Sequence, residues 1–510
     1  MKTAATKYFQ KTVSGTKKYA VAASFVKKMA ALKQELQPNA QRESQLPSRL
    51  ALRKHPCHLS LPPLTLPDHL DRAAIDYLRE HCLFSIKHLN QLSAKLNNFL
   101  HERPILTEME ILEKRRVSQA INNPPVETPD DAENFEDTNQ SKIDDVLKYY
   151  SEKSISEPAA SSSPSFRFNK ENSQLYLVGR LAPNFATACR VLYEIRKRCP
   201  LFVPRSLFDF ASGLGTYTWA ANTVWPAGCI REHYLVEAST HMTSISEFLL
   251  LKRGKGIPPS ETVFPGVRHR RFLPSLQINA DLVMSGYVLL EVAGEVERMK
   301  IVENLWQRTS GFLTSGFLVL IEEGTKAGFS ALLEARDRLV SSAVLPVIKR
   351  GGEDMHMFAP CPHLLKCGKV GMTCSSAVRY YQLGLTKDEA YPSVENFSYL
   401  VVSRGDWRRF ASPDEAEHVL PRIVSTLPNP RAPALDVDLC LPNGDCERVT
   451  FSRTGTDRTL FFFLKNSAAG DIAPCLRSTE DSVDEEAEDI DDEERVEDEA
   501  DAVEEGGGGK

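Results

Sequence analysis

Short apolar runs, separated by stretches long enough for helices, dominate the middle of the chain. Between residues 206 and 324 these runs are SLFDF, HYLVEA, ADLVMSGYVLL and GFLVLIEEG. Strands buried on both faces are near-continuously hydrophobic, and their alternation with helices is typical of a doubly wound sheet. The pattern therefore predicts an α/β fold of the Rossmann-like kind, with its core at residues 166–350.

Helical spacing of apolar residues appears before this core. It predicts helices from about residue 68 to residue 116, inside a helical N-terminal region at 35–119, and another helix over 181–198. After the core, FSYLVVSRG predicts a strand, and LDVDLCLPNGDCERVTFSR predicts a hairpin that turns at Asn443 and Gly444. We assign residues 351–470 to a cysteine-containing segment and to the C-terminal strands of the same domain.

Three segments differ from this pattern in charge. Residues 1–34 contain eight lysines and no acid, which resembles a mitochondrial presequence, although a basic surface helix that stays attached would look similar. Residues 120–165 are acidic and rich in Pro and Ser, which predicts a disordered insertion. We also expect a disordered acidic tail at 471–510. Between residues 480 and 505 it carries 17 acids and one arginine, a charge of −16, so the rest of the chain carries +10.

The basic body is compatible with RNA binding, and no apolar stretch of about 18 residues or more predicts a membrane span. Phosphate contacts are expected from residues 267–271 (VRHRR) and 366–369, with Arg379 nearby.

A glycine-containing turn follows the first strand of the predicted sheet, in SLFDFASGLGTYTWAAN. Asp209, Gly213 and Gly215 lie at the carboxyl end of that strand, where open α/β sheets bind ligands. The segment lacks the G-x-G-x-x-G of dinucleotide folds. Its D-x-A-x-G-x-G pattern resembles the first motif of class I S-adenosylmethionine-dependent methyltransferases, with Ala211 where their first glycine usually stands. We expect a slightly reshaped pocket and weaker cofactor binding.

Two further acids are candidates for the same pocket. Glu237 ends the second apolar run, where an acid in such folds bonds the ribose hydroxyls, and Asp281 opens the run that follows, near the expected adenine edge. No catalytic group is evident. Ser285, Gly286 and Tyr287 stand where amino-methylating enzymes carry an Asn/Asp-Pro-Pro-aromatic segment.

Cysteines cluster in PCPHLLKCGKVGMTC, which holds Cys361, Cys367 and Cys374 together with His363. Their spacings match neither the usual zinc knuckle nor the ferredoxin motifs, yet the loop could wrap a thiophilic metal. Cys440 and Cys446 flank the predicted hairpin turn, and either could supply the fourth ligand. The residues alone leave zinc and an iron–sulfur cluster open. Eleven cysteines in 510 residues do not indicate a disulfide scaffold.

Six segments, in this order, resemble the methyltransferase-like mitoribosomal small-subunit assembly factors: DFASGLGTYTWAANTVW, ADLVMSGYVLLEV, LVLIEEGTKAGFSALLEAR, APCPHLLKCGKVGMTC, FSYLVVSRG and DVDLCLPNGDCERVTFSR. The resemblance spans about residues 170–455. It implies a class I methyltransferase fold that binds S-adenosylmethionine and a 4Fe–4S cluster, with zinc as the alternative. The ligands it implies are Cys361, Cys367, Cys374 and Cys440.

The same resemblance implies a function in the mitochondrial matrix. The chain would bind small-subunit ribosomal RNA and proteins beside other assembly factors, as a monomer within the assembly particle, and would support mitochondrial translation. Methyl transfer itself would be doubtful or lost. Two alternatives remain: an active ribosomal RNA methyltransferase of the same subunit, or a redox carrier that uses the cysteine site. The second is disfavoured because no dinucleotide or flavin fingerprint accompanies the cysteines.

Overall fold

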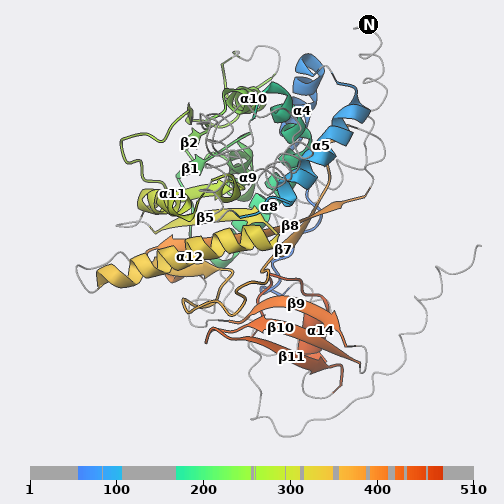
Figure 1. Cartoon of the computed structure of the whole chain (residues 1–510), viewed down its shortest axis with the longest axis vertical. Coiled ribbons are helices and arrows are strands. Elements are labelled where there is room, and N and C mark those ends of the chain that lie inside the picture. The colour runs from blue at the N-terminus through green and yellow to red at the C-terminus, as the bar shows by residue number, and fades with distance from the viewer. Residues whose placement is uncertain are drawn as a thin grey trace, which may run out of the picture. The chain divides into compact units, whose positions relative to one another are not determined.

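The structure is a computed structural model, and the parts of the chain that it describes all lie between residues 55 and 474 (Figure 1). The described ranges are 55–82, 84–105, 168–253, 258, 260–292, 294–310, 315–347, 355–385, 391–411, 420–429, 433–454 and 458–474. The predicted presequence, the acidic insertion and most of the acidic tail lie outside these residues.

The main sheet has eight strands in the order β3-β2-β1-β4-β5-β8-β6, with β7 also paired to β8. The first five are parallel, and β8 runs antiparallel to β5. Their bounds are β1 Ser206–Phe210, β2 Glu232–Val236, β3 Val267–Arg270, β4 Leu282–Gly286, β5 Gly316–Glu323, β6 Met355–Ala359, β7 Ser376–Tyr380 and β8 Ser393–Arg404. This confirms the predicted doubly wound α/β sheet.

Alternate residues of the strands enter two hydrophobic cores, one on each face of the sheet. On β5, Phe317 and Val319 belong to one core and Leu318 and Leu320 to the other. The first face is covered by α8 (Lys170–Arg198), α9 (Thr216–Val224) and α10 (Thr240–Leu250). The second is covered by α11 (Glu295–Arg308) and α12 (Lys326–Val347). Every residue of β5 is buried, as a central strand requires.

The N-terminal region is helical, as predicted, over the residues that the structure describes there. Its helices are α4 (Asp68–His81) and α5 (Ile86–His101). Ser85 caps α5 by accepting a hydrogen bond from the amide of His88, at 3.4 Å. The helix predicted over 181–198 starts earlier, at Lys170, where the side chain of Asn169 caps it.

A second, three-stranded sheet lies C-terminal to the main one (orange to red in Figure 1). It consists of β9 (Arg422–Pro428), β10 (Ala434–Cys440) and β11 (Cys446–Ser452), packed with α14 (Arg458–Lys465) around its own core. The predicted hairpin is β10–β11, and Gly444 in its turn adopts φ 92°. Within the predicted segment 351–470, β6, β7 and β8 extend the main sheet, whereas β9–β11 form a separate one.

We predicted that the disordered acidic tail begins at residue 471, and this boundary is wrong. Asp471 is buried, and its carboxylate accepts hydrogen bonds from the amides of Leu59 and Ala468, at 2.7 and 2.9 Å. The Ile472 amide donates to the carbonyl of Cys57. These contacts extend the folded part to Pro474. No helix among the described residues has the length and apolar character needed to cross a bilayer.

Candidate cofactor loop and four-cysteine pocket

The glycine turn after β1 is the tightest part of the predicted cofactor site. Gly213 and Gly215 have φ angles of 52° and 71°, a left-handed conformation that side chains disfavour. A Cβ at Gly215 would also lie 2.7 Å from the Ser246 hydroxyl oxygen. Backbone shape and lack of space together explain why this turn uses glycines.

Ala211 shares the left-handed conformation of these glycines, with φ 54°. This is the position where the methyltransferase motif usually has glycine. An alanine there carries a steric cost of about 1–2 kcal/mol. The alanine that replaces the glycine of the motif therefore strains the backbone where the turn begins.

Asp209 is completely buried at the end of β1, and neither of its carboxyl oxygens has a hydrogen-bond partner among the described residues. Burial, with a smaller contribution from the nearby Glu237 carboxylate, raises the pKa of Asp209 well above its usual value. A buried polar group without a partner is costly, so such a group at a strand end is typical of a ligand site.

Glu237 follows β2 at the same edge of the sheet. Its carboxylate accepts hydrogen bonds from the Gly213 and Ser239 amides, both at 2.8 Å. Burial raises the pKa of Glu237, and these amides partly offset the rise. The structure thus brings together four of the five predicted cofactor residues, Asp209, Gly213, Gly215 and Glu237.

The prediction for Asp281 is wrong. It precedes β4, so it lies at the amino edge of the parallel sheet, whereas Asp209 and Glu237 lie at the carboxyl edge. Its carboxylate accepts hydrogen bonds from the Arg205 amide, at 2.8 Å, and from the Ser206 hydroxyl, at 3.3 Å. Asp281 therefore fastens the starts of β1 and β4, and has no place at an adenine pocket.

The segment after β4, where amino-methylating enzymes grip their substrate, is filled by the protein itself. Tyr287 is buried, and its hydroxyl donates to the hydroxyl of Thr187 at 3.1 Å. The Arg180 guanidinium lies 4.7 Å from the centre of the Tyr287 ring. A Cβ at Gly286 would overlap the Tyr217 hydroxyl, at 1.7 Å.

Arg180 also belongs to a buried charge network beside that segment. It pairs with Glu323 at 3.1 Å and with Glu395 at 2.8 Å, and His101 contacts Glu323 at 2.8 Å. His101, Glu323 and Glu395 bring three potential ligand atoms within 4.8 Å of one another. Because Arg180 already supplies the positive charge there, we interpret the group as a structural ion network.

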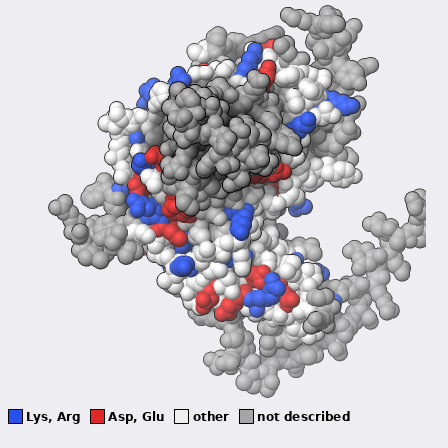
Figure 2. Space-filling view, in the orientation of Figure 1, with Lys and Arg blue, Asp and Glu red and all other residues white. Residues whose placement is uncertain are grey.

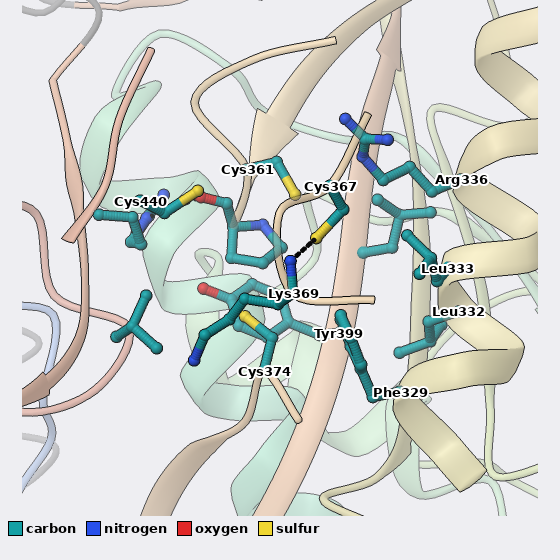
Figure 3. A pocket seen from close by; sticks show the side chains of 14 residues that line it. Phe329, Leu332, Leu333, Arg336, Cys361, Cys367, Lys369, Cys374, Tyr399 and Cys440 are labelled. Carbon is teal, nitrogen blue, oxygen red and sulfur yellow. Dashed lines mark hydrogen bonds between the residues drawn. The ribbon is translucent and has the colours of Figure 1, made fainter. Parts of the chain in front are cut away.

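The cysteine loop connects β6 to β7, which both pair with β8. Cys361, Cys367 and Cys374 come from this loop, and Cys440 comes from the end of β10 in the small sheet. All four line one pocket, which Figure 3 shows with their sulfurs directed inward around Lys369 and Tyr399. The structure therefore gathers the four thiols implied by the family resemblance.

Buried arginines hold the backbone of this loop in place. Arg336 on α12 donates to the carbonyls of His363 and Leu365, and Arg422 on β9 donates to the carbonyl of Pro360 at 2.9 Å. The loop ends at Cys374, whose carbonyl accepts a hydrogen bond from Ser398 on β8 at 2.9 Å. These fixed points come from three elements, so the loop is shaped by the surrounding fold.

Sequence reasoning missed Arg336 and Arg422, which both line the cysteine pocket. The one available signal was an arginine in the mainly apolar helix SALLEARDRLV. Lys369, predicted to contact phosphate, lines the pocket as well, and its ammonium donates to the carbonyl of Thr373.

Burial raises the pKa of the Cys361 and Cys440 thiols, and raises that of Cys374 to about 12. The neighbouring thiols add to the rise at all three, while Arg336 or Lys369 opposes it at Cys361 and Cys374. A metal binds the thiolate form, so its binding at this pocket would release the protons of these thiols.

Four thiols from one pocket are a donor set that suits both a structural zinc ion and an iron–sulfur cluster. His363 lies at the edge of the group, with its Nε2 atom 3.5 Å from the Cys440 sulfur.

Strand order, the antiparallel β8, the glycine turn and the acid after β2 together define a class I S-adenosylmethionine-dependent methyltransferase fold, here with an added four-cysteine pocket. The chain belongs to the family described as mitochondrial small ribosomal subunit Rsm22, which matches residues 170–474.

Relatives agree with this family. The chain is 32% identical over 431 residues to the human "Ribosome assembly protein METTL17, mitochondrial", covering 83% of this chain and 86% of the human protein. It is 37% identical over 86 residues to the two Rsm22-cox11 tandem proteins of Schizosaccharomyces pombe, which is 17% of this chain and 11% of each relative. The family is mitochondrial, and so is this chain.

Among solved structures, a class I S-adenosylmethionine-dependent methyltransferase described as putative, from Listeria monocytogenes, is 12% identical. It covers 66% of this chain and 86% of its own, with a TM-score of 0.29. A score this low adds nothing to what the strand topology shows.

Proposed function

We propose that this chain is an assembly factor of the mitochondrial small ribosomal subunit that binds ribosomal RNA and holds a 4Fe–4S cluster and S-adenosylmethionine. The observation that carries the proposal is the convergence of four cysteines from two sheets on one pocket, in a member of the Rsm22 family. The chain would act in the matrix, as a monomer within the assembly particle, beside ribosomal proteins and other assembly factors.

The resemblance of the cysteine segments to the assembly-factor family supports a cluster over zinc, because four thiols by themselves suit either metal. Arg336 and Lys369 line the pocket and would offset part of the negative charge of four thiolates. A bound cluster would tie the small sheet to the cysteine loop. Iron, sulfide and zinc analysis after anaerobic purification tests this assignment.

The glycine turn fits S-adenosylmethionine because that molecule carries an ammonium and a sulfonium. Asp209 and Glu237 bring two carboxyl groups to the turn, and Asp209 has no partner among the described residues. A cationic ligand would stabilise both carboxylates.

Ala211→Gly should strengthen this site. Relief of about 1–2 kcal/mol of left-handed strain, offset by about 0.4–1 kcal/mol of extra freedom in the unfolded chain, leaves the variant about 0.8 kcal/mol more stable. Removing the methyl group should also tighten S-adenosylmethionine binding. Urea unfolding and calorimetric titration measure the two effects. Ala220→Gly, inside α9, is the control and should lower stability. An Ala211→Gly protein with weaker binding would contradict the argument.

Methyl transfer is the second candidate function, and the residues after β4 favour binding without transfer. Thr187 and Arg180 hold the Tyr287 ring in a buried position. The ring occupies the place that a substrate base would have to enter. Burial raises the pKa of Tyr287 well above its usual value, so its phenol stays protonated and is a poor general base. Methyl transfer from labelled cofactor to immature subunits is the measurement that would favour the enzyme instead.

Strand β3, at the edge of the main sheet, is the best candidate for contact with RNA. Arg268, Arg270 and Arg271 are exposed. Arg268 lies 5.5 Å from the centre of the Tyr234 ring, and Arg271 lies 5.4 Å from that of Phe272, which is 71% exposed. Guanidinium groups and exposed aromatic rings are the groups on which unpaired bases stack.

The small sheet is less suited to RNA. Figure 2 shows acidic and basic side chains side by side over β9–β11, in its lower part. There Arg448 is bound to Asp438 through two hydrogen bonds, of 2.7 and 3.0 Å. Its positive charge is already neutralised.

The double substitution Arg268→Ala with Arg270→Ala should weaken binding to small-subunit ribosomal RNA. If each arginine neutralises one phosphate, the slope of log affinity against log salt should fall by about 1.4–1.8. Filter binding over a salt series measures this slope. Arg448→Ala is the matched exposed control and should leave it unchanged. An unaltered slope in the double variant would exclude β3 from the interface.

A further inference from the structure

Cys446 is the cysteine of this region that the proposed cluster does not use. It opens β11, directly opposite Cys440, which closes β10. Cys440 is partly buried in the four-cysteine pocket, whereas Cys446 is exposed to solvent. A proposed cluster ligand therefore has an exposed thiol as its cross-strand partner.

The hairpin geometry suits a bond between these sulfurs. The amide of Leu441 donates to the carbonyl of Asp445, so the pair next to the turn is the hydrogen-bonded one. Pairs alternate along an antiparallel ladder, which makes Cys440 and Cys446 a non-hydrogen-bonded pair. Such pairs bring their Cα atoms to about 4.5 Å, inside the range of about 4.4–6.8 Å that disulfides adopt.

The tip of this hairpin also packs on the cysteine loop. A Cβ at Gly444 would lie 3.2 Å from the Cβ of Leu365, and one at Gly368 would lie 3.6 Å from the Cys446 sulfur. The neighbour of Gly368 is the proposed ligand Cys367. A bond between Cys440 and Cys446 would therefore affect the ligand Cys440 directly, and the loop that carries the ligand Cys367 through its contact with the hairpin.

We propose that Cys440 and Cys446 form a reversible disulfide that prevents cluster loading under oxidising conditions. The inference rests on the proposed cluster function, since Cys440 is its fourth ligand. With a hydroperoxide as oxidant, the Cys446 thiolate attacks one peroxide oxygen. A sulfur–oxygen bond forms, the oxygen–oxygen bond breaks, and hydroxide leaves to become water.

The Cys440 thiolate then attacks the Cys446 sulfur. A disulfide forms, the sulfur–oxygen bond breaks, and a second water leaves. Two thiols and one hydrogen peroxide become one disulfide and two waters. Cys440 then has no thiolate to offer to iron, and a dithiol reductant restores it.

The test uses the full chain freed of metal under anaerobic conditions. Protein exposed to hydrogen peroxide is digested, and mass spectrometry looks for peptides linked through Cys440 and Cys446. A second portion receives ferrous iron and sulfide, with or without prior reduction by dithiothreitol. We expect the linked peptide, loss of cluster absorbance in the oxidised wild type, and full recovery after reduction.

Cys446→Ser is the decisive variant, because it removes the exposed thiol and keeps all four proposed ligands. Its cluster uptake should equal that of the reduced wild type, and should survive the same peroxide exposure. The inference is overturned if no linked peptide forms, if the variant loses uptake as fast as the wild type, or if the unoxidised variant cannot bind the cluster. If the reduced wild type takes up no cluster, the proposed function fails, while the linked peptide still reports on the disulfide.

Discussion

Replacing Cys367 by serine should remove the metal and destabilise the region around the cysteine loop. Cys367 is buried in the pocket, and its sulfur accepts a hydrogen bond from the amide of Lys369 at 3.4 Å. A serine hydroxyl is a far weaker ligand than a thiolate for thiophilic metals. Structural zinc sites in small peptides contribute about 10 kcal/mol or more, and we expect loss of the metal proposed here to be strongly destabilising for the same reason.

The measurements are the metal content of anaerobically purified protein and its thermal unfolding with and without a chelator. The wild type should lose stability when the chelator is added, and the variant should already resemble the stripped wild type. Cys229→Ser is the control, since Cys229 precedes β2 and does not line the pocket. Full metal content in Cys367→Ser would exclude the assignment of four ligands.

Local patterns in the sequence predicted the sheet and most of the cofactor turn. Buried strands such as β5 are continuous apolar runs, which identified them without further information. The turn at Asp209–Gly215 combines an acid with glycines in a fixed local order, so its residues remain neighbours in any fold of this class. The first, second and fourth strands were found by the same reasoning.

The failures concern features that depend on contacts across the fold. Asp281 is an acid of the kind that binds ligands. Only the register of β1 and β4 shows that it lies at the amino edge of the sheet, opposite to Asp209 and Glu237. Strand β3 is an edge strand in which half-buried and exposed residues alternate, and most of them are polar. The hydrophobic pattern therefore did not distinguish it from a basic loop. Arg336 and Arg422 reach the cysteine loop from distant elements, which no local pattern reveals.

The buried carboxylate of Glu194 contacts both the main sheet, through Tyr399, and Arg422, which lines the cysteine pocket. Glu194 on α8 is 0% exposed, and three arginines contact its carboxylate: Arg190 at 3.2 Å, Arg198 at 3.2 Å and Arg422 at 2.8 Å. Tyr399 on β8 adds a hydrogen bond of 2.9 Å. Burial raises the pKa of Glu194, but the three arginines outweigh it and lower the pKa from 4.5 to about 2.

Glu194→Gln should therefore destabilise the protein by about 3–5 kcal/mol, because it leaves three buried arginines without their common counter-charge. The pH dependence has a defined sign. The pKa of Glu194 is lower in the folded protein than in the unfolded chain, so its stabilisation is complete above about pH 4.5 and is lost as the pH falls toward 2. The difference in unfolding free energy between wild type and Glu194→Gln should shrink by about 3 kcal/mol over that range.

Urea unfolding of both proteins over a pH series measures this difference. Glu297→Gln is the control, because Glu297 and its partner Lys300 are exposed and such pairs contribute about 0–1 kcal/mol. A difference that stays constant with pH would show that Glu194 is not the ionised centre of the network. Since Arg422 also holds the carbonyl of Pro360, next to Cys361, the variant should release iron to a chelator faster than the wild type at neutral pH. Equal release rates would mean that the buried charge network and the cysteine pocket are independent of each other.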